Sequence, residues 1–436
     1  MQLNPADRVK QTLFSTIDSL FEDRDALLYN PQSDFTRTKK ISFGKTMLYP
    51  MVAGSDNSAM ELLNLFGEED LPLPSAMIQR RNQVKPEAFR ELFCRFIRRI
   101  PIRQTFRGYQ IVSMDGSRLN LPYNPSDPDT FLQCIQGRKG INQMHLNSLY
   151  DPMNDIFLDV ELQGIRQVDE KDAFCRILDR NARLDPGLPR RIYLADRGYA
   201  AYNIFAHAIH NQQLFLIRVS AAFAEGICKG REHWLEDASS DEEITVHIGR
   251  RKTKRNRKLE NYHYIPTSRR YDFLDPGTDG TECLRLRVLK FPISEGSCEY
   301  IVTNLPSYAF SGDIIKALYS LRWNEETAFR HLKYAGNMVR IHSLKKELVV
   351  QEIYGKLTLY NFSAFIAAVV GHCQKDTCRY TYVLNHTQVQ KICIRFLQGT
   401  VQDVEALLSR FFVPVRPGRS FQRKLRRQSA DTLAYR

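Results

Sequence analysis

Four side chains between residues 319 and 333 have the types and the spacing that phosphodiester chemistry requires. Tyr319, Arg322, Glu326 and Lys333 follow the pattern Y-x2-R-x3-E-x6-K, in which each step is close to a whole number of helical turns. Arg330 continues this stripe four residues beyond Glu326. A carboxylate flanked by cations and a tyrosine suits a metal-dependent phosphodiester site. The alternative is a solvated helix face with i,i+4 salt bridges, and partner carboxylates elsewhere decide between the two.

Two aspartates are candidates for those partner carboxylates. Asp115 follows the apolar run 109–114 and Asp196 follows the apolar run 191–195, and each has a glycine within two residues. The carboxyl ends of parallel strands meet at the edge of an α/β sheet where ligands bind, so we expect the two aspartates to lie close together. Each alone is a weak signal, because strand-end aspartates also cap helices and form turns. Together with Glu326 they predict a site of three carboxylates.

The residue types of this predicted site select the ion. Three carboxylates without nearby Cys or His ligands favour a hard cation, Mg2+ or Mn2+, over zinc. Such a set can hold two ions roughly 3.5–4 Å apart, one activating a water or a 3′-hydroxyl and the other stabilising the leaving oxygen. Other chemistries lack support, because Ser117 has no GxSxG context and the sequence contains neither a Walker A loop nor GxGxxG.

The elements expected around these residues are ordered as in a ribonuclease-H-like fold. Strands are predicted at 109–114, 144–150, 155–162, 191–195 and 213–219, and helices at 169–181 and 202–209. The order of three strands, helix, strand, helix and strand matches a mixed sheet with helices on both faces. The predicted fold class is therefore α/β, a ribonuclease-H-like mixed sheet interrupted by a β-strand insertion domain, with helical N- and C-terminal regions.

The whole chain divides into five predicted segments. They are a helical N-terminal region (1–105), a first part of the core (106–219), a β insertion (220–310), a second part of the core with the helix of Glu326 (311–375), and a helical C-terminal region with a basic tail (376–436). In the N-terminal region, two short helices separated by a proline turn carry Arg80, Arg81 and Lys85. A DNA-binding helix-turn-helix and a plain structural pair explain them about equally well.

The charge of the chain favours a polyanionic partner. Its 436 residues include 62 Lys+Arg against 49 Asp+Glu, a formal net charge of +13, which indicates nucleic acid first and an anionic membrane surface second. The run 250–258 is either a solvated loop or a phosphate-binding one, and we favour phosphate contact. The cations predicted to make it are Arg250, Arg251, Lys252, Lys254 and Arg255. The tail from Arg416 to Arg427 is expected to be a disordered arm that orders on DNA.

The sequence predicts a cytoplasmic protein without a membrane partner. The N-terminal residues MQLNPADRVKQ contain no apolar signal core. The longest apolar run, from Thr358 to Gly371, is interrupted by Asn361 and Ser363 and is too short to span a bilayer. We expect this run to be a buried helix.

Three motifs together resemble those of a known family. The segments DGS at 115–117, ADRGY at 195–199 and YSLRWNEETAFRHLK at 319–333 are similar to the motifs of DDE transposases of bacterial insertion sequences, in the subgroup with the YREK signature. The separations of 81 residues from Asp115 to Asp196 and 130 residues to Glu326 also fit, the longer gap accommodating the β insertion typical of that subgroup. The resemblance covers residues 105 to 375.

This resemblance implies cut-and-paste DNA transposition. Asp115, Asp196 and Glu326 would bind two Mg2+ ions, with Mn2+ as a substitute, for strand cleavage at the element end and attack of the freed 3′-hydroxyl on DNA. The implied partners are double-stranded DNA, both the terminal inverted repeats and the target, and a second copy of the chain in a homodimeric synaptic complex. The implied location is the bacterial cytoplasm, at the nucleoid.

The resemblance also assigns the remaining signature residues. In relatives with hairpin intermediates the signature Tyr, Arg and Lys contact end phosphates, which implies that role for Tyr319, Arg322 and Lys333. Trp323 either stacks on a flipped base or anchors its helix in the core. Arg330 either contacts the DNA end together with these residues or pairs with Glu326.

Two other functions are compatible with the same residues. A catalytically inactive or domesticated transposase-like DNA-binding protein would explain the positive charge, but it leaves the three carboxylates a coincidence. A ribonuclease-H-like nuclease or resolvase would use the same carboxylates without a strand-transfer step.

Overall fold

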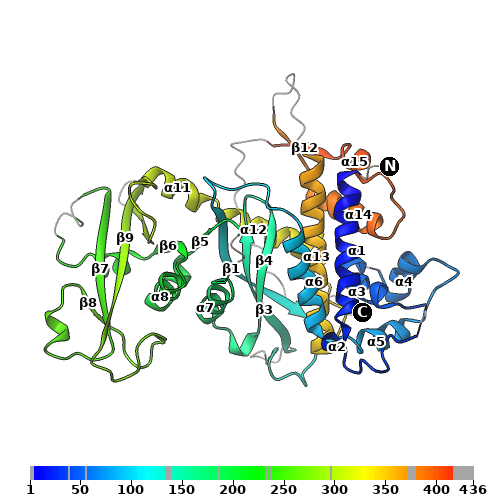
Figure 1. The fold of residues 1–436 in the computed structure, drawn as a ribbon, viewed down its shortest axis with the longest axis horizontal. Coiled ribbons are helices and arrows are strands. Elements are labelled where there is room, and N and C mark those ends of the chain that lie inside the picture. The colour runs from blue at the N-terminus through cyan, green and yellow to red at the C-terminus, as the bar shows by residue number, and fades with distance from the viewer. Residues whose placement is uncertain are drawn as a thin grey trace.

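The computed structural model describes residues 4–37, 40–54, 56–133, 139–183, 187–231, 234, 237–294, 297–371 and 380–415. The described chain is elongated, with three parts in a row (Figure 1): the β insertion at one end, the mixed sheet with its helices in the middle, and a helical region at the other end. Both the N-terminal and the C-terminal segments contribute to that helical region. The basic tail that we expect to bind DNA, residues 416–436, lies outside the described residues.

The central sheet has the predicted order of elements. Its core strands are β1 (Gln110–Leu121), β3 (Ile141–Asp151), β4 (Ile156–Gly164), β5 (Arg191–Ala195) and β6 (Leu214–Val219). They lie in the order β4-β3-β1-β5-β6, with β3 antiparallel to both β4 and β1, and with β5 parallel to both β1 and β6. Parallel strands need a crossover, which α7 (Glu170–Arg180) and α8 (Tyr202–His210) provide. The predicted ribonuclease-H-like fold class is confirmed.

Helices cover both faces of this sheet. On one face, Phe174 of α7 and Phe205 of α8 pack with Val112 and Tyr193 in a fully buried core. On the other face, Leu318 of α11 (Gly312–Ser320) packs in a second core with further residues of the same strands. Because both faces are covered, β5 is buried along nearly its whole length, as expected for a central parallel strand.

The β insertion extends the central sheet rather than forming a separate one. It contains β7 (Ser240–Gly249), β8 (Tyr262–Tyr264), β9 (Thr281–Ser294) and β10 (Ser297–Thr303). β10 pairs antiparallel with β6, from Tyr300 opposite Val219 to Thr303 opposite Leu216, and β9, β7 and β8 follow outward. The insertion is therefore joined to the core by backbone hydrogen bonds, and its strands are held in register with the strands beside the predicted site.

A buried arginine links the insertion to the segment that leads into α11. Arg287 of β9 is 3% exposed, and its guanidinium donates to both carboxylate oxygens of Asp241 on β7 (2.7 and 2.6 Å). It also donates to the carbonyls of Leu305 (3.3 Å) and Phe310 (2.7 Å). Those carbonyls precede α11, so Arg287 fixes where this helix begins.

The helical region is built around one long helix. Its main helices are α1 (Pro5–Glu22), α3 (Phe43–Val52), α5 (Pro74–Arg81), α6 (Pro86–Arg99), α13 (Lys346–Val370) and α14 (His386–Leu397). In Figure 1, α1, α6 and α13 run side by side, and their apolar faces form one core that continues to β3 and β4 through Leu146 and Phe157. The five predicted segments remain a prediction, and the structure adds that the first and last of them share this core.

α13 explains the apolar run that we predicted to be a buried helix. By length and composition alone its 25 residues suffice to cross a membrane, but 72% of its most apolar window is buried inside the protein. Asn361, within that run, accepts a hydrogen bond from the Phe157 amide (2.9 Å) and donates one to the Phe157 carbonyl (2.7 Å). These contacts are those of a core helix packed against β4.

The remaining elements are short. They are α2 (Arg24–Leu27), α4 (Ser58–Phe66), α9 (Ala221–Ile227), α15 (Val404–Leu408), β2 (Phe131–Leu132), β11 (Tyr382–Leu384), β12 (Phe412–Pro414) and the 3-10 turns Ile165–Gln167, Arg197–Tyr199 and Asn256–Lys258.

The geometry of α5 and α6 favours a structural pair over a DNA-binding one. Arg81, at the end of α5, is 3% exposed, pairs with Glu352 of α13 (3.2 Å) and donates to the Leu348 carbonyl (2.8 Å). Lys85 donates to the Ala26 carbonyl (2.9 Å). Because Arg81 is enclosed and α6 packs its apolar face against α13, two of the three cations considered for DNA contact are used inside the protein.

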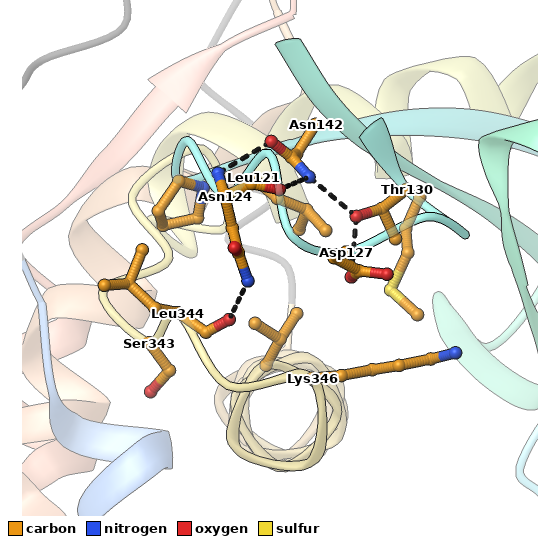
Figure 2. A pocket seen from close by; sticks show the side chains of 11 residues that line it. Leu121, Asn124, Asp127, Thr130, Asn142, Ser343, Leu344 and Lys346 are labelled. Atoms are coloured by element: carbon orange, nitrogen blue, oxygen red, sulfur yellow. Dashed lines mark hydrogen bonds between the residues drawn. The ribbon is translucent and has the colours of Figure 1, made fainter. Parts of the chain in front are cut away.

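A polar junction joins the end of β1 to the start of α13 (Figure 2). The Asn142 side chain accepts from the Asn124 amide, and it donates to the Asn124 carbonyl and to the Thr130 hydroxyl (2.8, 2.8 and 2.9 Å). Asn124 in turn donates to the Leu344 carbonyl (3.4 Å). The cavity at this junction has a volume of about 10 Å³, which is the space of a single water. The junction is a structural connection and not a substrate site.

We predict that Arg81→Met destabilises the protein by about 3–5 kcal/mol, because it leaves the buried Glu352 carboxylate without its cation. Arg80→Met is the matched control. Arg80 is only partly buried, and its guanidinium bonds to Gln83 (3.0 Å) and lies 4.8 Å from the centre of the Phe35 ring. Its loss is expected to cost about 1 kcal/mol or less. Urea unfolding of both variants measures the difference, and equal losses would contradict the buried pair at Arg81.

Candidate active site

The segment predicted as one helix consists of three pieces. They are α11, α12 (Trp323–Arg330) and a π-helical segment (His331–Ala335). Between α11 and α12 the Arg322 amide bonds to the Tyr319 carbonyl, three residues back (3.1 Å), and after α12 the Gly336 amide bonds to the His331 carbonyl, five residues back (2.9 Å). A tightened turn and a widened one change the rotation per residue. The prediction that Tyr319, Glu326 and Lys333 form one straight stripe is therefore wrong.

Asp115 was predicted to follow the end of its strand, but it lies inside β1. The parallel pairing of β1 with β5 ends at Met114 opposite Ala195, while β1 continues antiparallel to β3 as far as Leu121. Asp115 and Asp196 are each the first residue after this last parallel pair. The two aspartates therefore lie at the same edge, as expected. The end of the parallel β1–β5 pairing defines this edge, and the end of the strand β1 does not.

Backbone amides hold one oxygen of each aspartate. Asp115 Oδ1 accepts from the Gly116 amide (2.8 Å), and Asp196 Oδ1 accepts from the Gly198 amide (2.8 Å) at the start of the 3-10 turn. The absence of a side chain at Gly116 matters for a separate reason: a Cβ there would lie 2.3 Å from His145 Nε2. His145 on β3 pairs with Glu170 of α7 (3.0 Å). The DGS motif thus reflects a close approach of β1 to the His145 ring.

Two of the predicted carboxylates act on the third. Burial raises the pKa of Asp115 to about 6, the Gly116 amide and Arg322 oppose this, and the charges of Asp196 and Glu326 add to it. Carboxylates close enough to repel each other form a donor set that a hard divalent cation would neutralise. Among the described residues, no three Asp, Glu, His or Cys side chains are arranged to hold a metal ion as they stand. The set fits such an ion in charge and chemistry, and its side chains must turn to enclose one.

Arg322 is the internal cation of this site. It is 5% exposed, its Nη1 lies 3.7 Å from Asp115 Oδ2, and its guanidinium carbon lies 5.8 and 4.8 Å from the ring centres of Tyr319 and Trp323. Tyr319 is 3% exposed, and its hydroxyl has no hydrogen-bond partner among the residues that the structure describes. Trp323 is 51% exposed, so the interpretation of this residue as a core anchor is wrong.

The two other cations of the segment differ in their surroundings. Arg330 is exposed on α12. Lys333 lies in the π-helical segment, where partial burial lowers its pKa. A half-buried ammonium has already lost part of its hydration. A phosphate that binds it therefore displaces less water than it would from an exposed lysine.

Arg250 and Lys252 of the run 250–258 have different surroundings. Arg250 is 4% exposed and donates to the carbonyls of Pro266 and Arg269 (3.3 and 2.9 Å). Its guanidinium holds the insertion loops together and offers no surface to a phosphate. Lys252 is exposed, and its ammonium lies 4.7 Å from the centre of the Tyr264 ring.

The next cations of this run face outward. Arg251 pairs with Asp279 (3.1 Å), and both side chains are more than half exposed. Lys254 and Arg255 are exposed. Three of the five predicted phosphate-binding cations, Lys252, Lys254 and Arg255, are therefore at the surface without a described carboxylate partner in an ion pair.

One buried carboxyl group at this site was not predicted from the sequence. Glu325 is 0% exposed, and its Oε1 accepts from the Ser148 hydroxyl (2.9 Å). Burial and the neighbouring charge of Asp115 raise its pKa well above the ordinary value. A signal existed in the sequence, because Glu325 lies three residues after Arg322 and four before Phe329, on the inward stripe of α12. The adjacent Glu326 is only partly buried.

The raised pKa of Asp115 makes the stability of the protein depend on pH. The folded-state pKa of about 6 exceeds the ordinary 3.8, so ionised Asp115 opposes folding fully above pH 6 and ceases to do so as the pH falls towards 4. At ~1.4 kcal/mol per pKa unit this corresponds to about 3 kcal/mol. We therefore predict that Asp115→Asn is more stable than the parent protein at pH 7 in EDTA, and that this gain vanishes by pH 4.

Urea unfolding between pH 4 and 8 measures this effect. Asp18→Asn, which removes an exposed carboxylate on α1, is the control and should show no such trend. A gain in Asp115→Asn that stays constant over this range would contradict the assignment.

Comparisons with known proteins identify the family of the chain. No curated protein sequence matches the chain. Among solved structures, it is similar to the piggyBac transposase in a cryo-EM synaptic complex with hairpin DNA, with 9% identity and a TM-score of 0.44, over 96% of this chain and 87% of that one. Residues 106–362 match the family model described as the transposase DDE domain. This match spans more than half of the chain and includes Asp115, Asp196 and Glu326, so the chain belongs to the transposase DDE domain family.

Proposed function

We propose that the protein is a DNA transposase that binds the terminal inverted repeats of an insertion sequence and catalyses metal-dependent strand cleavage and strand transfer. One observation carries the proposal. Asp115, Asp196 and Glu326 come from three different elements of a transposase DDE domain, and the charges of Asp196 and Glu326 raise the pKa of Asp115 at the end of the β1–β5 ladder. The bacterial origin and the YREK subgroup are part of the proposal, and they are supported by the signature at Tyr319, Arg322, Glu326 and Lys333.

Asp115, Asp196 and Glu326 are proposed to hold two Mg2+ ions, for which Mn2+ can substitute. When bound, these ions would supply positive charge for the attacking and the leaving oxygens of the phosphodiester. The protein itself sets the position of the ligands. The Gly116 and Gly198 amides orient the two aspartates (2.8 Å each), and α12 presents Glu326 beside them.

The cations around this site are proposed to bind the DNA end. Lys333 and Arg330 contact its phosphates, and Arg322 turns from Asp115 towards phosphate once the carboxylates are neutralised. The exposed ring of Trp323 stacks on an unpaired base at the DNA end. The hydroxyl of Tyr319 is buried in this arrangement, so we propose that its ring supports the Arg322 guanidinium.

A second surface is proposed to bind DNA away from the carboxylates. It consists of the exposed cations Lys252, Lys254 and Arg255 in the β insertion. Two copies of the chain would assemble on paired ends as a homodimer, and the protein would act in the bacterial cytoplasm at the nucleoid.

We predict that Asp115→Asn lowers the rate of strand cleavage by about a thousandfold or more, because a lost metal ligand removes several kcal/mol of charge stabilisation and each ~1.4 kcal/mol is tenfold in rate. The measurement is Mg2+-dependent nicking of DNA that carries the element ends. DNA affinity should be retained. Asp313→Asn, an exposed carboxylate in the first turn of α11, is the control and should cleave normally.

Cleavage by Asp115→Asn at the rate of the parent protein would refute the site. A parent protein that binds element ends but never cleaves them would support the inactive DNA-binding alternative. Cleavage without joining to target DNA would support a nuclease or resolvase.

The insertion surface predicts a change in salt dependence. If Lys254 and Arg255 each contact one phosphate, Lys254→Ala with Arg255→Ala should reduce the log–log slope of affinity against salt by about 1.8, from ~0.9 per phosphate. Filter binding between 50 and 300 mM salt is a suitable assay. Arg250→Ala is the matched control from the same run: it should lower stability and leave the slope unchanged. An unchanged slope in the double variant would remove this surface from the proposal.

A further inference from the structure

The buried carboxyl group of Glu325 is the feature of the site that the proposed mechanism does not use. It is buried on α12 together with Phe329, beside the buried Arg322 that precedes this helix, whereas Glu326 is only partly buried. α12 packs against β1. A carboxyl group in such a place is unusual, because an apolar side chain of the same size would avoid the cost of desolvation.

The hydrogen bond of Glu325 reaches the strand pair at the level of Asp115. Ser148 Oγ on β3 donates to Glu325 Oε1 (2.9 Å), and Ser148 is directly opposite Asp115 in the antiparallel register of β1 and β3. Directly opposite residues project from the same face of a sheet. The bond therefore connects the residue before Glu326 to the cross-strand neighbour of Asp115.

A second serine lies on the same face. Ser113 is two residues before Asp115 on β1, is fully buried, and lies close enough to Glu325 to lower its pKa. Glu325 Oε2 has no hydrogen-bond partner among the described residues. Two serines and one buried acid thus form a polar contact between α12 and the strands, and its hydrogen bond is more directional than an apolar contact.

We propose that Glu325 is a positioning residue, which through Ser148 fixes the register of α12 against β1 and β3 so that Glu326 meets Asp115. This inference rests on the proposed function for its consequence in catalysis, and on the hydrogen bond and the strand register for its geometry. It predicts that the shape and the hydrogen bond of Glu325 matter, and that its negative charge does not.

Three variants test this role. Glu325→Gln keeps the acceptor oxygen and the shape, and should cleave element ends within about threefold of the parent protein. Glu325→Leu and Ser148→Ala remove the bond, and should lower kcat by 10- to 100-fold while the Kd for DNA changes less than twofold. The double variant Glu325→Leu/Ser148→Ala should be no slower than the slower single variant, because both changes break one contact.

Mn2+ binding provides a readout that does not need activity. Calorimetric titration should show weaker Mn2+ binding by Glu325→Leu and Ser148→Ala, by about tenfold, and near-normal binding by Glu325→Gln. Glu61→Gln alters another buried carboxyl group, which accepts from the Gly54 amide (2.8 Å) in the helical region. This control can lower stability but should leave Mn2+ affinity unchanged.

The outcomes separate this inference from the proposed function. Suppose that the parent protein binds Mn2+ but cleaves no DNA, and that Glu325→Leu and Ser148→Ala still lose Mn2+ affinity. This result would support the positioning role of Glu325 and contradict the proposed transposase function. Normal Mn2+ affinity and normal kcat in Ser148→Ala would overturn positioning, even if Glu325→Leu fails to fold. Loss of Mn2+ affinity in Glu325→Gln would also overturn it, because the charge would then be what matters.

Discussion

Repulsion of the Asp115 carboxylate by its acidic neighbours is the constraint on which the site depends. Burial already disfavours the charge of Asp115 at the end of the β1–β5 ladder, and the charges of Asp196 and Glu326 add to this effect. The structure balances this repulsion with the Arg322 guanidinium, 3.7 Å from Asp115, and with backbone amides on both aspartates.

This arrangement is possible because the segment from α11 to the π-helical turn is held firmly on both sides. Before it, Arg287 of the insertion fixes the carbonyls of Leu305 and Phe310. After it, Arg81 and Asn124 attach the start of α13 to the helical region and to the end of β1. The β insertion and the N-terminal helices therefore support the segment that carries Arg322 and Glu326 from opposite ends of the molecule (Figure 1).

The net charge of +13 overstates how many cations are available to a nucleic acid. Arg81, Arg250, Arg287 and Arg322 are each 5% exposed or less, and their hydrogen bonds and ion pairs are internal. Exposed cations such as Lys254, Arg255 and Arg330 remain for phosphate contact. The separation has a physical basis, since a guanidinium can satisfy several carbonyls at once and is less strongly hydrated than an ammonium.

The sequence by itself determined the element order of the core and the ribonuclease-H-like class, and it predicted the three carboxylates, because apolar runs and motif spacings are local patterns. Only the tertiary structure decided which of two nearby residues of the same type has a buried side chain. Glu325 and Glu326 are chemically identical, and the position of Ser148 makes one of them a buried hydrogen-bonded group. Arg250 and Arg255 belong to one basic run, and the carbonyls of Pro266 and Arg269 enclose only the first. The spacing also does not contain the break at Arg322 and the widened turn at Lys333, so it could not establish a single stripe on one helix. For Glu325 and Arg250 the deciding partners lie elsewhere in the sequence, and no local pattern contains them.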